Sequence, residues 1–94
     1  MHLPSLQQLR YLVALAEHRH FGRAAAACCV SQPALSTGIK DLEETLRARL
    51  VDRTSRRVAI TPLGQQVATR ARLILDQALS LTRLPRQDLP EAAD

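Results

Sequence analysis

The stretch Val30-Ser31-Gln32-Pro33-Ala34-Leu35-Ser36 decides the fold of this chain. Ser31 has the short hydroxyl side chain that caps free amide groups at a helix start, and Pro33 suits a first turn because no N–H is needed there. A helix is therefore expected from here to about residue 46. Its predicted buried stripe has apolar side chains at steps of four, three and four residues: Leu35, Ile39, Leu42 and Leu46.

Two more helices are expected before this start signal. Apolar residues recur at helical spacing over residues 6 to 16, and Ser5 is available as their N-cap. The alanine-rich residues 23 to 29 predict a short second helix with Gly22 in its cap region. Because only a short connection separates the second and third helices, the two would form a helix-turn-helix.

The outer face of the third helix carries short polar side chains followed by a base: Gln32, Ser36, Thr37 and Lys40. Amide and hydroxyl groups can read base edges in the major groove of DNA, and the Thr37 methyl can meet a thymine methyl. Taken alone, the same face would serve equally well as an ordinary solvent-exposed helix surface.

A basic hairpin is expected directly after this helix. From Leu50 onward, β-branched residues flank the polar turn Arg53-Thr54-Ser55-Arg56-Arg57. Arginine suits a wing beside the groove, since it neutralises phosphates and enters a narrow minor groove. Arg53 is the first candidate for the groove, and Arg56 and Arg57 are candidates for phosphates. A merely solvated turn is the alternative.

Thr61 and Pro62 predict the start of a fourth, long helix that runs to residue 84. Its apolar face is close to a heptad repeat, and a second row, Leu75 and Leu79, lies beside it. So short a chain cannot bury a face this wide, so a homodimer through this helix is expected. The predicted interface residues are Leu63, Val67, Ala71, Ile74, Leu75, Ala78 and Leu81.

These elements give a mainly α fold, a winged helix-turn-helix of three helices and a two-stranded hairpin followed by a long linker helix. Residues 1–61 are the expected DNA-binding domain, 62–84 the dimerisation helix, and 85–94 a flexible tail or hinge. Residues 1–75 contain eleven basic and five acidic residues, a net charge of +6. Twelve of the thirteen Lys and Arg residues of the chain are Arg. This balance suits phosphate contacts, although an ordinary basic surface would look the same.

Several classes of function are not expected. The sequence has no Ser/His/Asp arrangement, metal-spaced Cys/His cluster or glycine-rich phosphate loop, so an enzyme, a metal or a cofactor is not predicted. His18 and His20, expected beyond the end of the first helix, suit a turn or a phosphate contact better than a metal. Without a membrane-length apolar run or a leader, and with adjacent Cys28 and Cys29 unsuited to a disulfide framework, a cytoplasmic location is expected.

Over residues 5 to 84 the chain resembles the N-terminal domain of LysR-type transcriptional regulators. The resemblance rests on Phe21-Gly22-Arg23-Ala24-Ala25, on the stretch from Val30, on Ile39-Lys40-Asp41-Leu42-Glu43, and on the segments at residues 53–56 and 60–64. Residues 12–21 and 53–56 are most similar to the peroxide-sensing OxyR group. The family implies paired linker helices and a C-terminal effector domain, which would lie beyond residue 94 together with any peroxide-reactive cysteines.

The expected partner is double-stranded DNA with inverted half-sites, bound by a homodimer, and a longer parent protein is compatible with a tetramer. The predicted DNA contacts are Arg23, Ser31, Gln32, Pro33, Ala34, Ser36, Thr37, Lys40, Arg53, Thr54, Ser55, Arg56 and Arg57. A stand-alone fragment that dimerises and blocks a full-length regulator would share every one of these residues. Non-specific nucleoid packaging fits less well, because the third-helix face is not uniformly cationic.

Three positions depart from the pattern that the resemblance implies. Within the family pattern, Gly22 replaces a Ser or Thr cap, Arg47 a Gly, and Val51 a Phe that would pack the wing more tightly. Gly38, expected on the exposed side of the third helix, costs helix stability.

Overall fold

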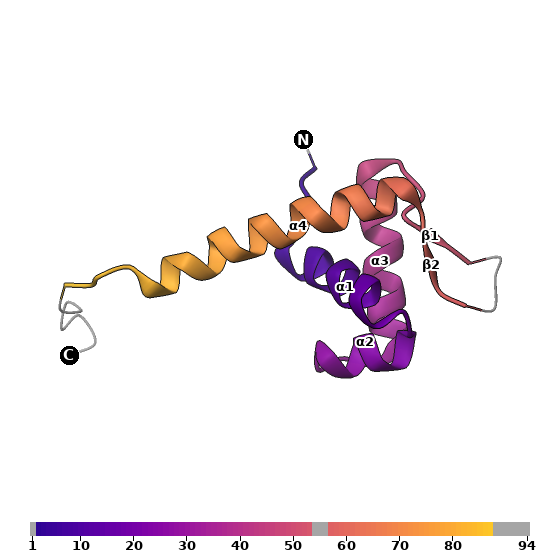
Figure 1. Ribbon diagram of the computed structural model, residues 1–94, viewed down its shortest axis with the longest axis horizontal. Coiled ribbons are helices and arrows are strands. Elements are labelled where there is room, and N and C mark those ends of the chain that lie inside the picture. Colours follow the sequence, from indigo (N-terminus) through magenta and orange to yellow (C-terminus); the bar gives the residue numbers. More distant parts are fainter. Residues whose placement is uncertain (1, 54–56, 88–94) are drawn as a thin grey trace.

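The computed structural model describes residues 2–53 and 57–87 of the chain, and it confirms the predicted fold (Figure 1). Three helices form a bundle, a short antiparallel hairpin follows, and a long helix crosses the bundle. In chain order the elements are α1 (Leu6–His18), α2 (Phe21–Ala27), α3 (Gln32–Leu46), β1 (Val51–Asp52), β2 (Ala59–Ile60), α4 (Pro62–Ser80) and a 3₁₀ turn (Leu81–Arg83).

The predicted N-caps of α1, α3 and α4 are confirmed. Ser5 accepts a hydrogen bond from the Gln8 amide at 3.0 Å, and the Gln8 side chain accepts one from the Ser5 amide at 3.0 Å. The Ser31 hydroxyl accepts from the Ala34 amide at 3.2 Å, and that of Thr61 accepts from the Gly64 amide at 2.9 Å. Each helix therefore begins where a short side chain can satisfy an amide three residues ahead.

The start of α2 differs from the prediction. The helix begins at Phe21, so Gly22 lies inside its first turn and not in its cap region. The N-cap is His20, whose Nδ1 accepts a hydrogen bond from the Arg23 amide at 3.0 Å. The imidazole thus caps the helix in the place of a Ser or Thr hydroxyl. His18 is the last residue of α1 and does not lie beyond that helix.

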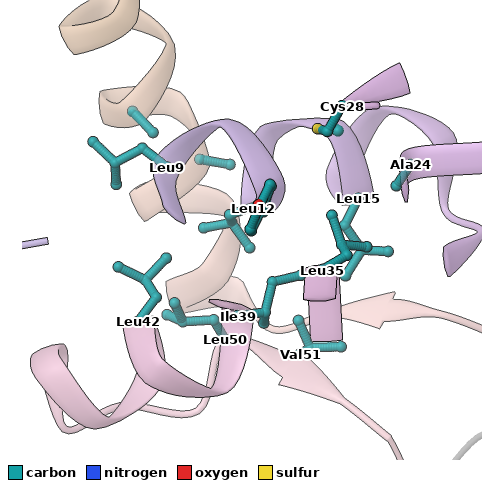
Figure 2. Packing of buried hydrophobic residues seen from close by; sticks show 14 of the residues in the cluster. Leu9, Leu12, Leu15, Ala24, Cys28, Leu35, Ile39, Leu42, Leu50 and Val51 are labelled. Carbon is teal, nitrogen blue, oxygen red and sulfur yellow. The ribbon is translucent and has the colours of Figure 1, made fainter. Parts of the chain in front are cut away.

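The core is mainly aliphatic, with Tyr11 as its buried aromatic residue, and it lies where α1, α3 and the start of β1 meet (Figure 2). Its fully buried large side chains are Leu12, Leu15, Leu35, Ile39, Leu42, Leu50 and Val51. Val51, which replaces the Phe of the family pattern, is 1% exposed and belongs to this core. Leu46 is a correction to the predicted stripe: it is the last residue of α3, and it is 37% exposed.

Gly38 is a second correction, because α3 approaches α1 closely there. The ring of Tyr11 occupies the space that a side chain at Gly38 would need, so this glycine is required by packing and is not an open surface position.

The hairpin is antiparallel, and it pairs Val51 with Ile60 and Asp52 with Ala59. From its end, α4 packs against α1, and its buried residues are the small Gly64, Ala68 and Ala71. Gly64 lies against the backbone of Leu50 and the side chain of Ile60. Beyond its contact with α1, the second half of α4 extends past the bundle, and the described molecule measures 54 × 26 × 22 Å (Figure 1). The helix expected to reach residue 84 changes to the 3₁₀ turn at Leu81.

Candidate nucleic-acid interface

The exposed face of α3 and the base of the hairpin enclose a groove of about 630 Å³. Its lining comes from three elements that are separate in the sequence: Phe21 of α2, Gln32, Pro33, Ser36 and Lys40 of α3, and Arg53 after β1. Gln32 and Lys40 are exposed and Ser36 is half-buried. The fold therefore places two of the predicted base-reading side chains and two cations around one concave surface.

The other predicted residues on α2 and α3 are arranged differently. Ala34 and Thr37 line a second groove of about 490 Å³, between α3 and α1, together with Tyr11. Ser31 is exposed, and its hydroxyl is already engaged as the N-cap of α3. Arg23 is exposed on α2 and lines neither of these two grooves.

A third groove of about 610 Å³ lies between the start of α2 and the hairpin. Two of the residues that line it were not among the predicted DNA contacts. Arg19 and His20 line it together with Gln32 and the predicted Arg57. The signal in the sequence was the basic turn 18–20, which suggested only an unspecified phosphate contact for its histidines. The predicted Thr54, Ser55 and Arg56 lie outside the described residues.

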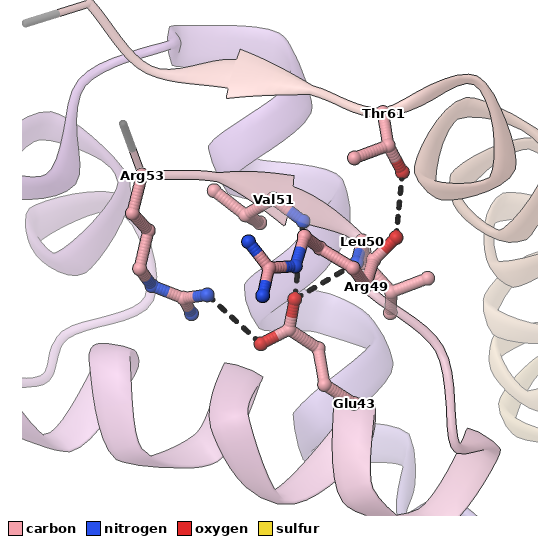
Figure 3. A network of polar contacts seen from close by, with 6 residues as sticks. All are labelled: Glu43, Arg49, Leu50, Val51, Arg53 and Thr61. Atoms are coloured by element: carbon pink, nitrogen blue, oxygen red, sulfur yellow. Dashed lines mark hydrogen bonds and ion pairs between the residues drawn. The ribbon is translucent and has the colours of Figure 1, made fainter. Parts of the chain in front are cut away.

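Glu43 on α3, which was not among the predicted contacts, joins this helix to the hairpin (Figure 3). One carboxylate oxygen accepts the amides of Leu50 at 2.8 Å and Val51 at 3.2 Å. The other oxygen accepts Nη1 of Arg53 at 2.9 Å, as a hydrogen bond and an ion pair. Arg53 is therefore held at the edge of the groove by an acid.

The environment of Glu43 favours its charged form. Burial raises the pKa of the Glu43 carboxyl, but the two backbone amides and Arg53 act in the opposite direction and outweigh it. The net result is a pKa lowered from the ordinary glutamate value. Beside it, the Thr61 hydroxyl donates to the Arg49 carbonyl at 2.8 Å, which ties the start of α4 to the base of the hairpin (Figure 3).

The two cysteines occupy different environments. Cys28 is buried in the core at 8% exposure, and Cys29 is exposed in the turn before α3. Burial raises the pKa of the Cys28 thiol, and the charge of Arg10 lowers it by less. Among the described residues, no group of three or more His, Cys, Asp or Glu side chains could hold a metal ion.

The structure divides the predicted dimer face of α4 into two parts. Ala71 is 1% exposed in the chain's own core, so it cannot contact a partner, and Val67 and Leu75 pack partly against the same core. Ala78 is half-buried. The large exposed side chains of α4 and the following turn are Leu63, Leu73, Ile74, Leu79 and Leu81.

Comparison with known proteins decides the family. Residues 6–65 match the sequence pattern of the family described as "Bacterial regulatory helix-turn-helix protein, lysR family". The chain belongs to the LysR family. This LysR-family segment contains every element that lines the grooves, from α1 to the start of α4, and the resemblance predicted from the sequence is confirmed. No helix in residues 2–53 and 57–87 is long and apolar enough to cross a membrane.

Individual relatives support the same conclusion. The chain is 51% identical over 85 residues to the HTH-type transcriptional regulator EstR of Acinetobacter baylyi, an alignment that covers 90% of this chain and 28% of EstR. Full-length OxyR of Pseudomonas aeruginosa superposes with a TM-score of 0.83 at 43% identity, over 87% of this chain and 28% of that one. The similarity to OxyR is thus confirmed, and it is shared with EstR.

Several similar structures were solved with DNA. The BenM DNA-binding domain in complex with catB site 1 DNA superposes with a TM-score of 0.75 at 41% identity, over 84% of this chain and 92% of that one. The LysR-family chain described here thus spans little more than a quarter of EstR but matches nearly the whole of an isolated DNA-binding domain.

Proposed function

We propose that this LysR-family chain binds double-stranded DNA sequence-specifically, with α3 in the major groove and the β1–β2 hairpin at its edge. The observation that carries the proposal is the groove where Gln32 and Ser36 of α3 lie together with Lys40 and Arg53. Amide and hydroxyl groups read base edges, and flanking cations contact phosphates or enter the minor groove. The BenM complex supports the proposal, because the BenM DNA-binding domain, which has a similar structure, is bound to DNA in it.

The remaining contacts follow from their places around the groove. Arg19, His20 and Arg57 line the neighbouring groove and would meet the phosphate backbone. Ser31 and Pro33 act by fixing the start of α3, and Ala34 and Thr37 would contact DNA from the side nearer α1. Binding to chromosomal DNA would place the protein in the cytoplasm, at the nucleoid.

A second copy of the chain would cover the exposed apolar side chains of α4. Pairing about a two-fold axis presents two copies of α3 to the duplex, which requires inverted half-sites about one or more helical turns apart. The exposed Leu63, Ile74, Leu79 and Leu81 carry this part of the proposal.

Selection of duplexes from a random library by the 94-residue chain tests the proposed function. The expected product is a pair of inverted half-sites. Gln32→Ala and Ser36→Ala should change the preferred base at particular positions, whereas Lys40→Ala should weaken all sequences and reduce the salt dependence. Thr69→Ala, on the exposed surface of α4, is the control. A dimer that selects no duplex would point instead to a fragment acting by protein interaction.

A further inference from the structure

Glu43 joins the DNA-facing helix to the hairpin through both of its carboxylate oxygens. One oxygen is held by the amides of Leu50 and Val51, at 2.8 and 3.2 Å, so the carboxylate has a fixed position. Its side chain is only 14% exposed. This geometry differs from that of a solvent-exposed ion pair, in which both side chains move freely and little is gained.

The second oxygen fixes Arg53. It accepts Nη1 at 2.9 Å, while the Arg53 side chain is 34% exposed at the groove lined by Gln32, Ser36 and Lys40. A guanidinium is planar and has five N–H donors in a rigid fork, so a bond at Nη1 restricts the direction of the others. The carboxylate can therefore hold one edge of the guanidinium while another edge faces DNA.

We propose that Glu43 is a positioning residue for DNA recognition, which holds Arg53 in the orientation that contacts the duplex beside α3. This inference rests on the proposed function. Because the acid and the guanidinium are already placed before DNA arrives, the arginine does not lose that freedom on binding. Glu43 contributes to affinity through Arg53 and does not itself touch the DNA.

The sign of the expected effect separates this role from simple electrostatics. An acid near the DNA-binding face repels phosphates, so its removal by charge alone should strengthen binding. A positioning role predicts the opposite, that removal of the same charge weakens binding. The neighbouring Glu44 is an exposed acid on the same helix and provides the matched control.

The test compares Glu43→Gln, Glu44→Gln, Arg53→Ala and the double variant Glu43→Gln/Arg53→Ala. Glutamine can still accept the two backbone amides through its carbonyl oxygen, but its NH₂ group then faces the Arg53 donor and cannot hold it. Affinity for the selected duplex is measured by titration at fixed salt, and thermal unfolding is measured on the same samples. The expected loss for Glu43→Gln is about tenfold, which corresponds to ~1.4 kcal/mol. Glu44→Gln should bind as wild type or more tightly.

The double variant decides whether the effect passes through Arg53. If it does, Glu43→Gln causes no further loss once Arg53 is alanine; losses that simply multiply would reject the inference. Tighter binding by Glu43→Gln would also reject it. A wild-type chain that binds no duplex would reject the proposed function itself, which is a separate outcome. If Glu43→Gln fails to fold, Arg53→Lys is the second test: it keeps the charge but lacks the rigid fork, so affinity should fall, and unchanged affinity would overturn the inference.

Discussion

The ring of Tyr11 on α1 lies directly against the backbone of α3 at Gly38. A Cβ added at Gly38 would lie 2.6 Å from Cε2 of Tyr11, and Tyr11 itself is only 7% exposed. The two helices therefore approach this closely only because position 38 has no side chain.

Replacement of Gly38 by alanine should destabilise the protein, although alanine is favoured over glycine within a helix by ~1 kcal/mol. Overpacking against a buried ring outweighs that gain, and the free energy of unfolding in urea should fall by about 1 kcal/mol or more. Thr37→Ala, on the exposed side of the same helix, should leave stability unchanged or slightly raised. A more stable Gly38→Ala variant would contradict the packing role of this glycine.

Arg47 closes α3 in a left-handed conformation, with φ 51° and ψ 49°. Residues with a Cβ adopt this region at a cost of roughly 1–2 kcal/mol, and glycine adopts it freely. Arg47→Gly should therefore raise the free energy of unfolding by about 0.5–1 kcal/mol, after the greater freedom of glycine in the unfolded chain is subtracted. Arg47→Ala keeps the Cβ and should give no gain. Equal stability of the two variants would show that the conformation carries no strain.

Acid should weaken the junction between α3 and the hairpin. The pKa of Glu43 is lowered in the folded chain, so its contribution to stability is complete above the ordinary glutamate pKa of about 4.3. That contribution is lost as the pH falls through the lowered value. The difference in unfolding free energy between wild type and Glu43→Gln should therefore shrink on acidification. Glu44→Gln is the control variant, and a pH-independent difference for Glu43→Gln would contradict the assignment.

A charge in the exposed apolar face of α4 should prevent pairing of two chains. Ile74 is 46% exposed, and Ile74→Glu would place a carboxylate where a second copy is expected. Sedimentation should show monomers, and these should bind DNA weakly because only one α3 reaches the duplex. Gln77→Glu adds the same charge at an exposed polar position of α4 and serves as the control. An unchanged dimer in Ile74→Glu would remove Ile74 from the interface.

The two cysteines should not respond to peroxide in a way that affects DNA binding. The Cys28 thiol is buried and has a raised pKa, so its reactive thiolate is scarce. Cys28→Ser should lower the free energy of unfolding by about 1 kcal/mol because a hydroxyl would be buried, and Cys29→Ser should be nearly neutral. DNA affinity is compared with and without peroxide for wild type and both variants. A reversible change that requires either cysteine would place a redox switch in this domain.

The sequence was most informative where structure depends on neighbouring residues. The hydroxyls of Ser5, Ser31 and Thr61 meet amides three residues ahead, so the starts of three helices could be read directly. His20 was missed as a cap because an imidazole takes that role only in a suitable orientation, which the sequence does not indicate.

Contacts between elements were harder to predict. The position of Glu43 depends on where α3 ends and how the hairpin returns, so its bonds to Leu50, Val51 and Arg53 leave no periodic signal. Ala71 shows a related limit. Its spacing correctly indicates an apolar row on α4, but spacing cannot say whether the chain's own core or a second chain covers that residue.

The second half of α4 extends past the bundle, so its helical structure should depend on whether a second chain is bound (Figure 1). The helical turns beyond the bundle have little tertiary support, and adding residues to an existing helix is only marginally favourable in water, so this free end should fray. In a lone chain, the amide hydrogens of residues 76–83 should therefore exchange rapidly with solvent. A second copy that covers the segment would slow this exchange, so helix content here would rise with protein concentration. The distance between the two copies of α3 would then be set by dimer assembly and not by the folding of either chain alone.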